Sequence, residues 1–483
     1  MRRRTKIVAT LGPASAEPGV LREMLRAGLD VVRLNLSHGD HATHRRLLAS
    51  ARAAAAELGV CLAVMPDLQG PKIRIEGFRR GPVRLAAGEP FALDVALAAD
   101  AGDEQVVGVS YKQLPEDVAP GDILLLADGL IRLKVARVRG SRVETTVLVG
   151  GELSDAKGLN RFGGGLSVAA LTDKDREDIR FCAEIGADYM AVSFPRDGAD
   201  IEQARRLLRE AGGDAGIVAK IERREALDNL DEIMEMADAV MIARGDLAVE
   251  IGDEELAGVQ KDLMRRARAR DCVVITATQM MQSMVSSPTP TRAEVLDVGN
   301  AVLDDTDAVM LSEETAVGAH PARVLEAMAR VCAGTERYQR FAAHHEDATS
   351  GYRYMDEAIA KASIDTANRL GARAIAALTE SGATALWMSR IGTELPIFAF
   401  TRHEATRRKV ALYRGVYPLA LDVAEADHAR VNRQVLERLR EEGVLSQGDL
   451  LVLSKGDLAG VKGGTNTMKI LRLEERPGEA PSA

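Results

Sequence analysis

Three charged side chains at the ends of two apolar segments have the types and spacing to do chemistry. Lys220 and Glu222 end the segment 217–222, and Asp246 follows the segment 240–243. Side chains at i and i+2 of a strand share a face, so Lys220 and Glu222 point the same way. Two carboxylates suit Mg²⁺, which prefers hard oxygen ligands, and the lysine would neutralise a phosphoryl group during transfer. A buried ion pair beside a partly exposed acid is the structural alternative.

Apolar segments of this kind recur with the spacing of alternating strands and helices. Strands buried on both faces read as continuous apolar runs, so the pattern predicts a (β/α)8 TIM barrel, with an open doubly wound sheet as the alternative. In a barrel the polar residues after the strands gather at one end, where active sites form. The expected strands are 6–10, 31–35, 61–67, 189–193, 217–222, 239–243, 273–276 and 308–311. The polar residues at their ends are Arg33, Asn35, Asp67, Ser193, Lys220, Glu222, Asp246, Thr276, Thr278, Ser312 and Glu314.

Two regions depart from the barrel pattern. Residues 70–165 form short alternating segments with turn signals, which predicts an inserted β-rich lid domain that leaves the active end and returns through a glycine hinge at 163–165. A phosphate cradle formed by that glycine run is the alternative. Residues 350–475 repeat an α/β pattern and predict a C-terminal α/β domain. The barrel then comprises 1–69 and 166–340. In the C-terminal part, the loop 379–384 offers hydroxyls and N–H groups for an anion, although ordinary turn and N-cap chemistry explains it equally well.

Composition narrows the class of protein. The net charge of −9 (63 basic and 72 acidic residues) and 3% aromatic content argue against nucleic-acid binding. The cysteines are widely spaced in apolar runs, as expected for thiols in a reducing compartment. No stretch approaches a membrane span, and the basic start 1–4 precedes too short an apolar run for a signal peptide. We expect a cytoplasmic protein without a membrane partner.

Six ordered motifs across the chain resemble the pyruvate kinase family. They are RLNLSHG at 33–39, DLQGPKIR at 67–74, IVAKIE at 217–222, ARGD at 243–246, ATQM at 277–280 and PTRAE at 290–294. The resemblance extends to the lid and the C-terminal domain. It implies a cytoplasmic, typically homotetrameric enzyme of glycolysis, which transfers the phosphoryl group of phosphoenolpyruvate to ADP and protonates the enolate to give pyruvate and ATP.

The resemblance also implies roles for individual residues. Lys220 would stabilise the transferring phosphoryl group, and Thr278 would orient the water that protonates the enolate, in a relay with Ser312 and Glu314. The substrate would contact Arg33, Lys220, Thr278 and the backbone of Arg244, Gly245 and Asp246. Mg²⁺, or Mn²⁺, would lie on Glu222 and Asp246. Asn35, His38, Arg74 and, from the lid, Lys157 would bind the nucleotide, and Asp128 would reach towards the closed site.

Two departures from the family pattern carry predictions. The family's K⁺ lies near Asn35, Ser37 and Asp67, and K⁺-dependent members have Thr and Glu where this chain has Leu68 and Lys72. The Lys72 ammonium can replace the ion, so we expect no K⁺ requirement; Lys72 pointing to solvent is the alternative.

The second departure lies in the C-terminal loop, where Ala383 replaces a basic residue common in the family. The loop residues Thr379, Ser381, Gly382 and Thr384 would then bind a phosphorylated effector, AMP or a sugar monophosphate, with charge supplied by Arg402.

Two other classes of function remain open. One is a catalytically silent metabolite sensor, and the other is a different Mg²⁺-enolate barrel enzyme such as an acyl lyase.

Overall fold

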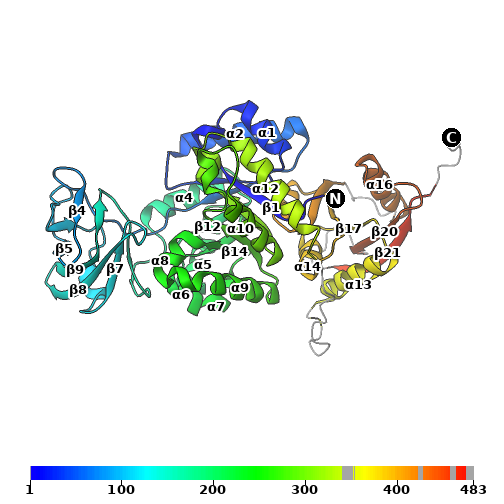
Figure 1. Cartoon of the computed structure of the whole chain (residues 1–483). Helices are drawn as coiled ribbons and strands as arrows, with labels where there is room; N and C mark the ends of the chain where they lie inside the picture. Colours follow the sequence, from blue (N-terminus) through cyan, green and yellow to red (C-terminus); the bar gives the residue numbers. More distant parts are fainter. Residues whose placement is uncertain (1, 340–351, 353, 422–427, 457–463, 475–483) are drawn as a thin grey trace. The chain divides into compact units, whose positions relative to one another are not determined.

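The computed structural model describes residues 2–339, 352, 354–421, 428–456 and 464–474. A closed parallel barrel joins strands in the order β1-β16-β15-β14-β13-β12-β3-β2 (Figure 1), so the predicted barrel is confirmed and the doubly wound sheet is excluded. The barrel strands are β1 (Lys6–Thr10), β2 (Val31–Asn35), β3 (Ala63–Asp67), β12 (Tyr189–Val192), β13 (Gly216–Ile221), β14 (Ala239–Ala243), β15 (Val273–Ala277) and β16 (Ala308–Leu311).

The barrel elements follow from their sequences. β14 and β15 are apolar apart from one threonine and buried along their whole length, as strands between a barrel interior and a helix layer must be. Several helices begin at side-chain caps, such as Thr172 before α4 and Thr291 before α10. The helices are α1 (Pro18–Arg26), α2 (His41–Leu58), α4 (Asp173–Glu184), α5 (Gly198–Glu210), α6 (Arg224–Asp228), α7 (Leu230–Met236), α8 (Arg244–Ile251), α9 (Asp253–Ala269), α10 (Arg292–Leu303), α11 (Glu313–Ala316) and α12 (Pro321–Glu336).

The insertion after β3 is rich in strands, as predicted. Its main sheet has the order β11-β7-β8-β9-β5-β6, a separate pair joins β10 to β4, and one apolar core serves the whole insertion. Its elements are β4 (Val83–Leu85), β5 (Pro90–Asp94), β6 (Val106–Gly108), α3 (Leu114–Asp117), β7 (Ile123–Leu126), β8 (Ile131–Arg139), β9 (Arg142–Val149), β10 (Gly151–Leu153) and β11 (Leu159–Arg161).

The C-terminal part is the predicted α/β domain, with one strand that the sequence did not reveal. Its sheet has the order β19-β18-β17-β20-β21, in which β21 runs antiparallel at the edge. The strands are β17 (Ala374–Leu378), β18 (Ile397–Thr401), β19 (Val416–Ala420), β20 (Leu450–Gly456) and β21 (Thr465–Arg472). The helices are α13 (Met355–Leu370), α14 (Ala383–Ile391), α15 (Glu404–Val410) and α16 (His428–Glu441).

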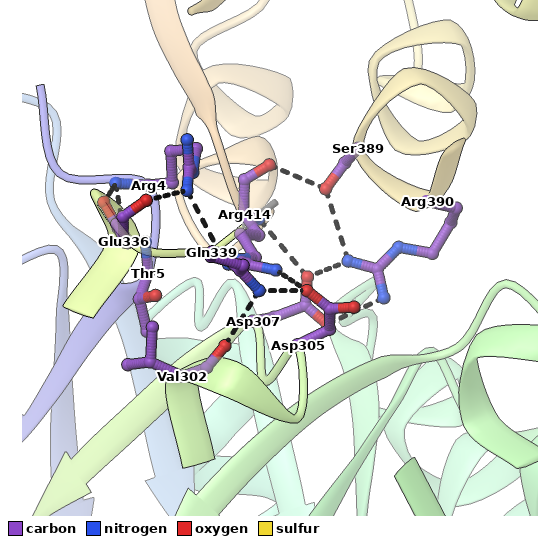
Figure 2. Close-up of polar contacts among 10 residues, drawn as sticks. All are labelled: Arg4, Thr5, Val302, Asp305, Asp307, Glu336, Gln339, Ser389, Arg390 and Arg414. Atoms are coloured by element: carbon purple, nitrogen blue, oxygen red, sulfur yellow. Dashed lines mark hydrogen bonds and ion pairs between the residues drawn. The ribbon is translucent and has the colours of Figure 1, made fainter. Parts of the chain in front are cut away.

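Ion pairs tie this α/β domain to the residues just before β16 (Figure 2). Asp307, just before β16, is completely buried and binds both terminal nitrogens of Arg390, near the end of α14. Arg414, before β19, binds Asp305 and Gln339. Glu336 at the end of α12 accepts the backbone N–H of Arg4 at 3.0 and 2.9 Å. Because Asp307 and Arg390 are both buried, loss of either partner would be costly.

The chain divides into two compact units that do not coincide with the three predicted domains. The first unit comprises Met1–Leu34, Ala42–Met65 and Met280–Ala483, and the second comprises Asn35–His41 and Pro66–Gln279. The predicted boundaries at 69, 165, 340 and 350 stay predictions. Within the described ranges, no helix combines the length and apolar character needed to cross a bilayer.

Candidate active site

The second unit brings Lys220 together with three side chains at the strand ends. The Lys220 ammonium lies 2.8 Å from Glu222 Oε1 and 3.3 Å from Asp67 Oδ1, and it donates to Ser193 Oγ at 2.7 Å. Both carboxylates are 1% exposed. The predicted convergence of Lys220 and Glu222 is therefore present, although β13 ends one residue before Glu222. A fixed ammonium with few water contacts acts strongly on an anion that enters beside it.

Glu222 has the surroundings of a metal ligand. Burial raises the pKa of its carboxyl, Lys220 opposes that rise, and the nearby carboxylate of Asp246 adds to it. Its second oxygen accepts the backbone N–H of Phe194 at 2.9 Å. A divalent cation between Glu222 and Asp246 would relieve this crowding of negative charge. The described residues contain no group of three or more His, Cys, Asp and Glu side chains that could hold a metal, whereas a pair of carboxylates fits Mg²⁺, which keeps positions for water and substrate oxygens.

The Lys72 ammonium forms an ion pair with the carboxylate of Asp246. The two charges are 3.0 Å apart, and their side chains are 28% and 25% exposed. The other residues of the predicted monovalent-cation region have partners of their own. Asn35 Oδ1 accepts the Ser37 N–H at 3.2 Å, and Asp67 faces Lys220. Lys72 therefore contributes its charge at the expected metal ligand Asp246, and the alternative in which it points only to solvent does not hold.

Arg244, Gly245 and Thr278 meet where β14 and β15 end. The Gly245 N–H donates to Thr278 Oγ1 at 2.9 Å. The Arg244 guanidinium donates to the carbonyls of Ala277 and Thr278 at 3.1 and 2.8 Å. In this conformation the backbone N–H expected to hold a substrate carboxylate is occupied by the threonine hydroxyl.

The first unit holds Arg33, Ser312 and Glu314. Arg33 is 9% exposed and donates to Thr10 Oγ1 at 2.9 Å. Glu314 is completely buried, and its two oxygens accept the N–H groups of Met281 at 3.1 Å and Ser312 at 2.6 Å. Glu314 therefore fixes the backbone around Ser312. These contacts support a structural role for Glu314 in the predicted relay.

Of the predicted nucleotide residues, His38 and Lys157 are exposed, whereas Asn35 and Arg74 are half-buried. Arg74 donates to the carbonyl of Ala156 at 2.8 Å, and the neighbouring Lys157 is exposed, as are His38 and Asp128. In the predicted hinge, Gly163, Gly164 and Gly165 all have positive φ, between 77° and 93°. The N–H groups of Gly163 and Gly165 are already bonded to the Glu250 carbonyl and the Glu225 carboxylate, which favours the hinge over a phosphate cradle.

The C-terminal loop is organised by its own hydroxyls. Thr379 Oγ1 accepts the Gly382 N–H at 2.9 Å, Ser381 Oγ accepts the Ala383 N–H at 3.4 Å, and Thr384 Oγ1 lies 2.7 Å from Thr465 Oγ1. Gly382 has φ +88°, and a Cβ there would lie 2.7 Å from Val410, so glycine is required.

The charge expected from Arg402 is already engaged in this loop. The Glu380 carboxylate lies 3.7 Å from Arg402 Nη2 and 2.5 Å from His403 Nε2. A phosphorylated ligand at the loop would therefore compete with Glu380 for these cations.

Sequence reasoning passed over two residues of the site. Ser193 was seen only as a polar residue after a strand, and its bond to Lys220 gives it a role. Glu250, four residues after Asp246 on α8, is 4% exposed and binds the lid residue Asn160 at 3.3 Å. Asp246 and Glu250 are at i and i+4 of a helix, which places them on the same face, and this spacing was the signal in the sequence.

Comparisons with known proteins agree with this geometry. Residues 2–325 match the family described as pyruvate kinase, barrel domain, and residues 357–471 match pyruvate kinase, alpha/beta domain. Pyruvate kinase II of Salmonella typhimurium is 52% identical over 476 residues, 98% of this chain and 99% of the relative. A pyruvate kinase of Haemophilus influenzae is 47% identical with the same coverage. The crystal structure of a pyruvate kinase from Cryptosporidium parvum aligns with a TM-score of 0.91 and 33% identity, covering 98% of this chain and 96% of that one.

Proposed function

The chain belongs to the pyruvate kinase family of phosphotransferases, and on that premise we propose that it transfers the phosphoryl group of phosphoenolpyruvate to ADP with Mg²⁺, needs no K⁺ and responds to a phosphorylated effector. The observation that carries the catalytic part is the Lys220 ammonium held between the buried carboxylates of Glu222 and Asp67. Transfer of a phosphoryl group needs positioning and positive charge more than covalent chemistry.

Each part of the site has a defined task in this proposal. Lys220 neutralises charge on the phosphoryl group, and Arg33 binds the same group. Glu222 and Asp246 hold Mg²⁺, which when bound stabilises negative charge on substrate oxygens. Because the Gly245 N–H is bonded to Thr278 Oγ1, the substrate carboxylate binds the other backbone N–H groups at the start of α8, and Thr278 orients the water that protonates the enolate.

The test is pyruvate formation from phosphoenolpyruvate and ADP with Mg²⁺ in tetramethylammonium buffer, before and after addition of KCl. Pyruvate formation that requires ADP supports the function. Turnover without ADP would indicate a different Mg²⁺-enolate enzyme, and no turnover with any effector would favour a metabolite sensor.

Independence from K⁺ rests on Lys72 and Leu68. The Lys72 ammonium lies 3.0 Å from Asp246 and supplies a fixed positive charge, while Leu68, 1% exposed, offers no oxygen ligand. Full activity before KCl is expected, and Lys72→Glu with Leu68→Thr should create a K⁺ requirement. Lys134→Glu on the exposed face of β8 is the matched charge change and should not. Activity that appears only after KCl would refute the proposal.

Regulation by AMP or a sugar monophosphate rests on the C-terminal loop. A phosphate that binds the loop would displace the Thr379 hydroxyl from the Gly382 N–H, and Glu380 competes for Arg402 and His403, which disfavours a second phosphate there. Substrate saturation curves with AMP, sugar monophosphates and fructose 1,6-bisphosphate test this. Identical curves throughout would contradict it.

We also propose the cytoplasmic location and homotetrameric assembly typical of the family. The exposed apolar side chains of Leu296 and Leu303 on α10, and of Val317, support an interface between copies. Light scattering coupled to size-exclusion chromatography would show a mass four times that of the chain.

A further inference from the structure

The turn after β15 adopts an unfavourable backbone conformation at two successive residues. Thr278 has φ +69° and Gln279 has φ +55°. Residues other than glycine rarely adopt the left-handed region, and for a β-branched threonine it is a true outlier. Such strain persists only where the surrounding structure over-determines it, and it clusters at functional sites.

Arg244 is placed to hold this turn. Ala243 and Ala277 are register partners at the ends of β14 and β15, so Arg244 and Thr278 leave the two strands side by side. The Arg244 side chain donates through Nε to the Ala277 carbonyl at 3.1 Å and through Nη2 to the Thr278 carbonyl at 2.8 Å. These carbonyls belong to the two peptide planes that flank Thr278. A rigid guanidinium that fixes both planes therefore fixes φ and ψ of Thr278.

The orientation of the Thr278 hydroxyl follows from that clamp. Its oxygen accepts the Gly245 N–H at 2.9 Å, and its hydrogen points to the Ala277 carbonyl at 2.6 Å. The hydroxyl consequently faces the first turn of α8, where the substrate carboxylate and Asp246 are expected. If the turn relaxed to an ordinary right-handed conformation, the hydroxyl would leave this position.

We propose that Arg244 is a positioning residue for protonation of the enolate, acting through Thr278 and without contacting substrate through its side chain. This inference rests on the proposed function. In the step concerned, the methylene carbon of the enolate forms a bond to a proton from the water that Thr278 orients. The hydroxide left behind takes a proton from bulk solvent.

The test separates proton transfer from phosphoryl transfer. Exchange of the pyruvate methyl hydrogens with D₂O, followed by NMR, reports only the proton step, and steady-state kinetics report kcat and the KM for phosphoenolpyruvate. Arg244→Gln is expected to slow exchange and lower kcat by about 100-fold with little change in KM, because small misplacements of a reacting group cost that much. Arg244→Lys should retain an intermediate rate. The matched control is Arg205→Gln. Arg205 lies away from the site, where it donates to the Met236 carbonyl and to Asp238.

A second-site change keeps the proposal testable if Arg244→Gln does not fold. Gln279 is exposed, and glycine adopts a positive φ without strain, so Gln279→Gly should recover part of the exchange rate lost in Arg244→Lys. Wild-type exchange in Arg244→Gln, a raised KM with unchanged kcat, or no recovery by Gln279→Gly would each overturn the proposal. If the wild-type enzyme forms no pyruvate, the proposed function fails instead.

Discussion

The buried carboxylate of Glu250 is expected to make the stability of the protein depend on pH where the β-rich insertion joins α8. Its carboxylate accepts the Arg224 N–H at 3.0 Å and the Asn160 side-chain amide at 3.3 Å, and its backbone carbonyl accepts the Gly163 N–H at 2.9 Å. It thereby joins α8 to α6, to the lid strand β11 and to the glycine hinge. The charged groups that influence it most are Arg223, which favours the ionised form, and Glu225, which opposes it.

Burial raises the pKa of the Glu250 carboxyl from 4.5 to about 7, against hydrogen bonds that would lower it. Between these two values the folded protein binds more protons than the unfolded chain, so the free energy of unfolding falls as the pH rises from 4.5 to 7 and is level above 7. At about 1.36 kcal/mol for each tenfold change in proton affinity, the loss is about 3 kcal/mol. Glu250→Gln removes the charge and keeps an acceptor for the Arg224 N–H.

The expected result is that Glu250→Gln is more stable than the wild type at pH 8, by up to about 3 kcal/mol, and little different at pH 5. Calorimetric unfolding at the two pH values measures this difference in stability. Amide hydrogen exchange in peptides covering 159–166 shows whether the difference arises where the β-rich insertion ends. Glu254→Gln on the exposed start of α9 controls for removal of a carboxylate. An equal effect of Glu250→Gln at both pH values, or a loss of stability at pH 8, would refute the reasoning.

Two further substitutions test a buried ion pair and a close contact made by a glycine. Asp307→Asn should lower the free energy of unfolding by about 3–5 kcal/mol, measured by calorimetry, because it leaves buried Arg390 without its carboxylate. Arg438→Gln breaks the exposed pair with Glu442 and should cost below about 1 kcal/mol; equal costs would contradict the argument. Gly70→Ala should lower kcat, because a Cβ there lies 2.7 Å from Cβ of Ser193, which holds Lys220. Gly59→Ala has a similar φ with no neighbour within 4 Å, so a kcat as low as that of Gly70→Ala would rule out displacement of Ser193 as the cause.

The barrel and many of its strand-end residues could be predicted from sequence because the strands are short, mostly apolar runs with polar residues at or just after their ends. Lys220, Glu222 and Asp246 needed only the two-residue period of a strand and the rule that parallel strands end together. The edge strand β21 gave no such signal, because it is mostly exposed or half-buried and mixes polar and apolar residues. The strained turn at Thr278 was also hidden, because its conformation depends on the side chain of Arg244 on the preceding βα unit.

The partner of Lys72 shows why charge placement needs the fold. Lys72 and Asp246 are 174 residues apart, and nothing in their local sequence pairs them. Together with Lys220, Lys72 offsets two of the three carboxylates of Asp67, Glu222 and Asp246, which leaves about one negative charge among these five side chains. A divalent cation on Glu222 and Asp246 would make the net charge of this group positive, which favours the binding of an anionic substrate beside it. A neutral residue in place of Lys72 would leave this group with about two negative charges, which one divalent ion would neutralise without making the group positive.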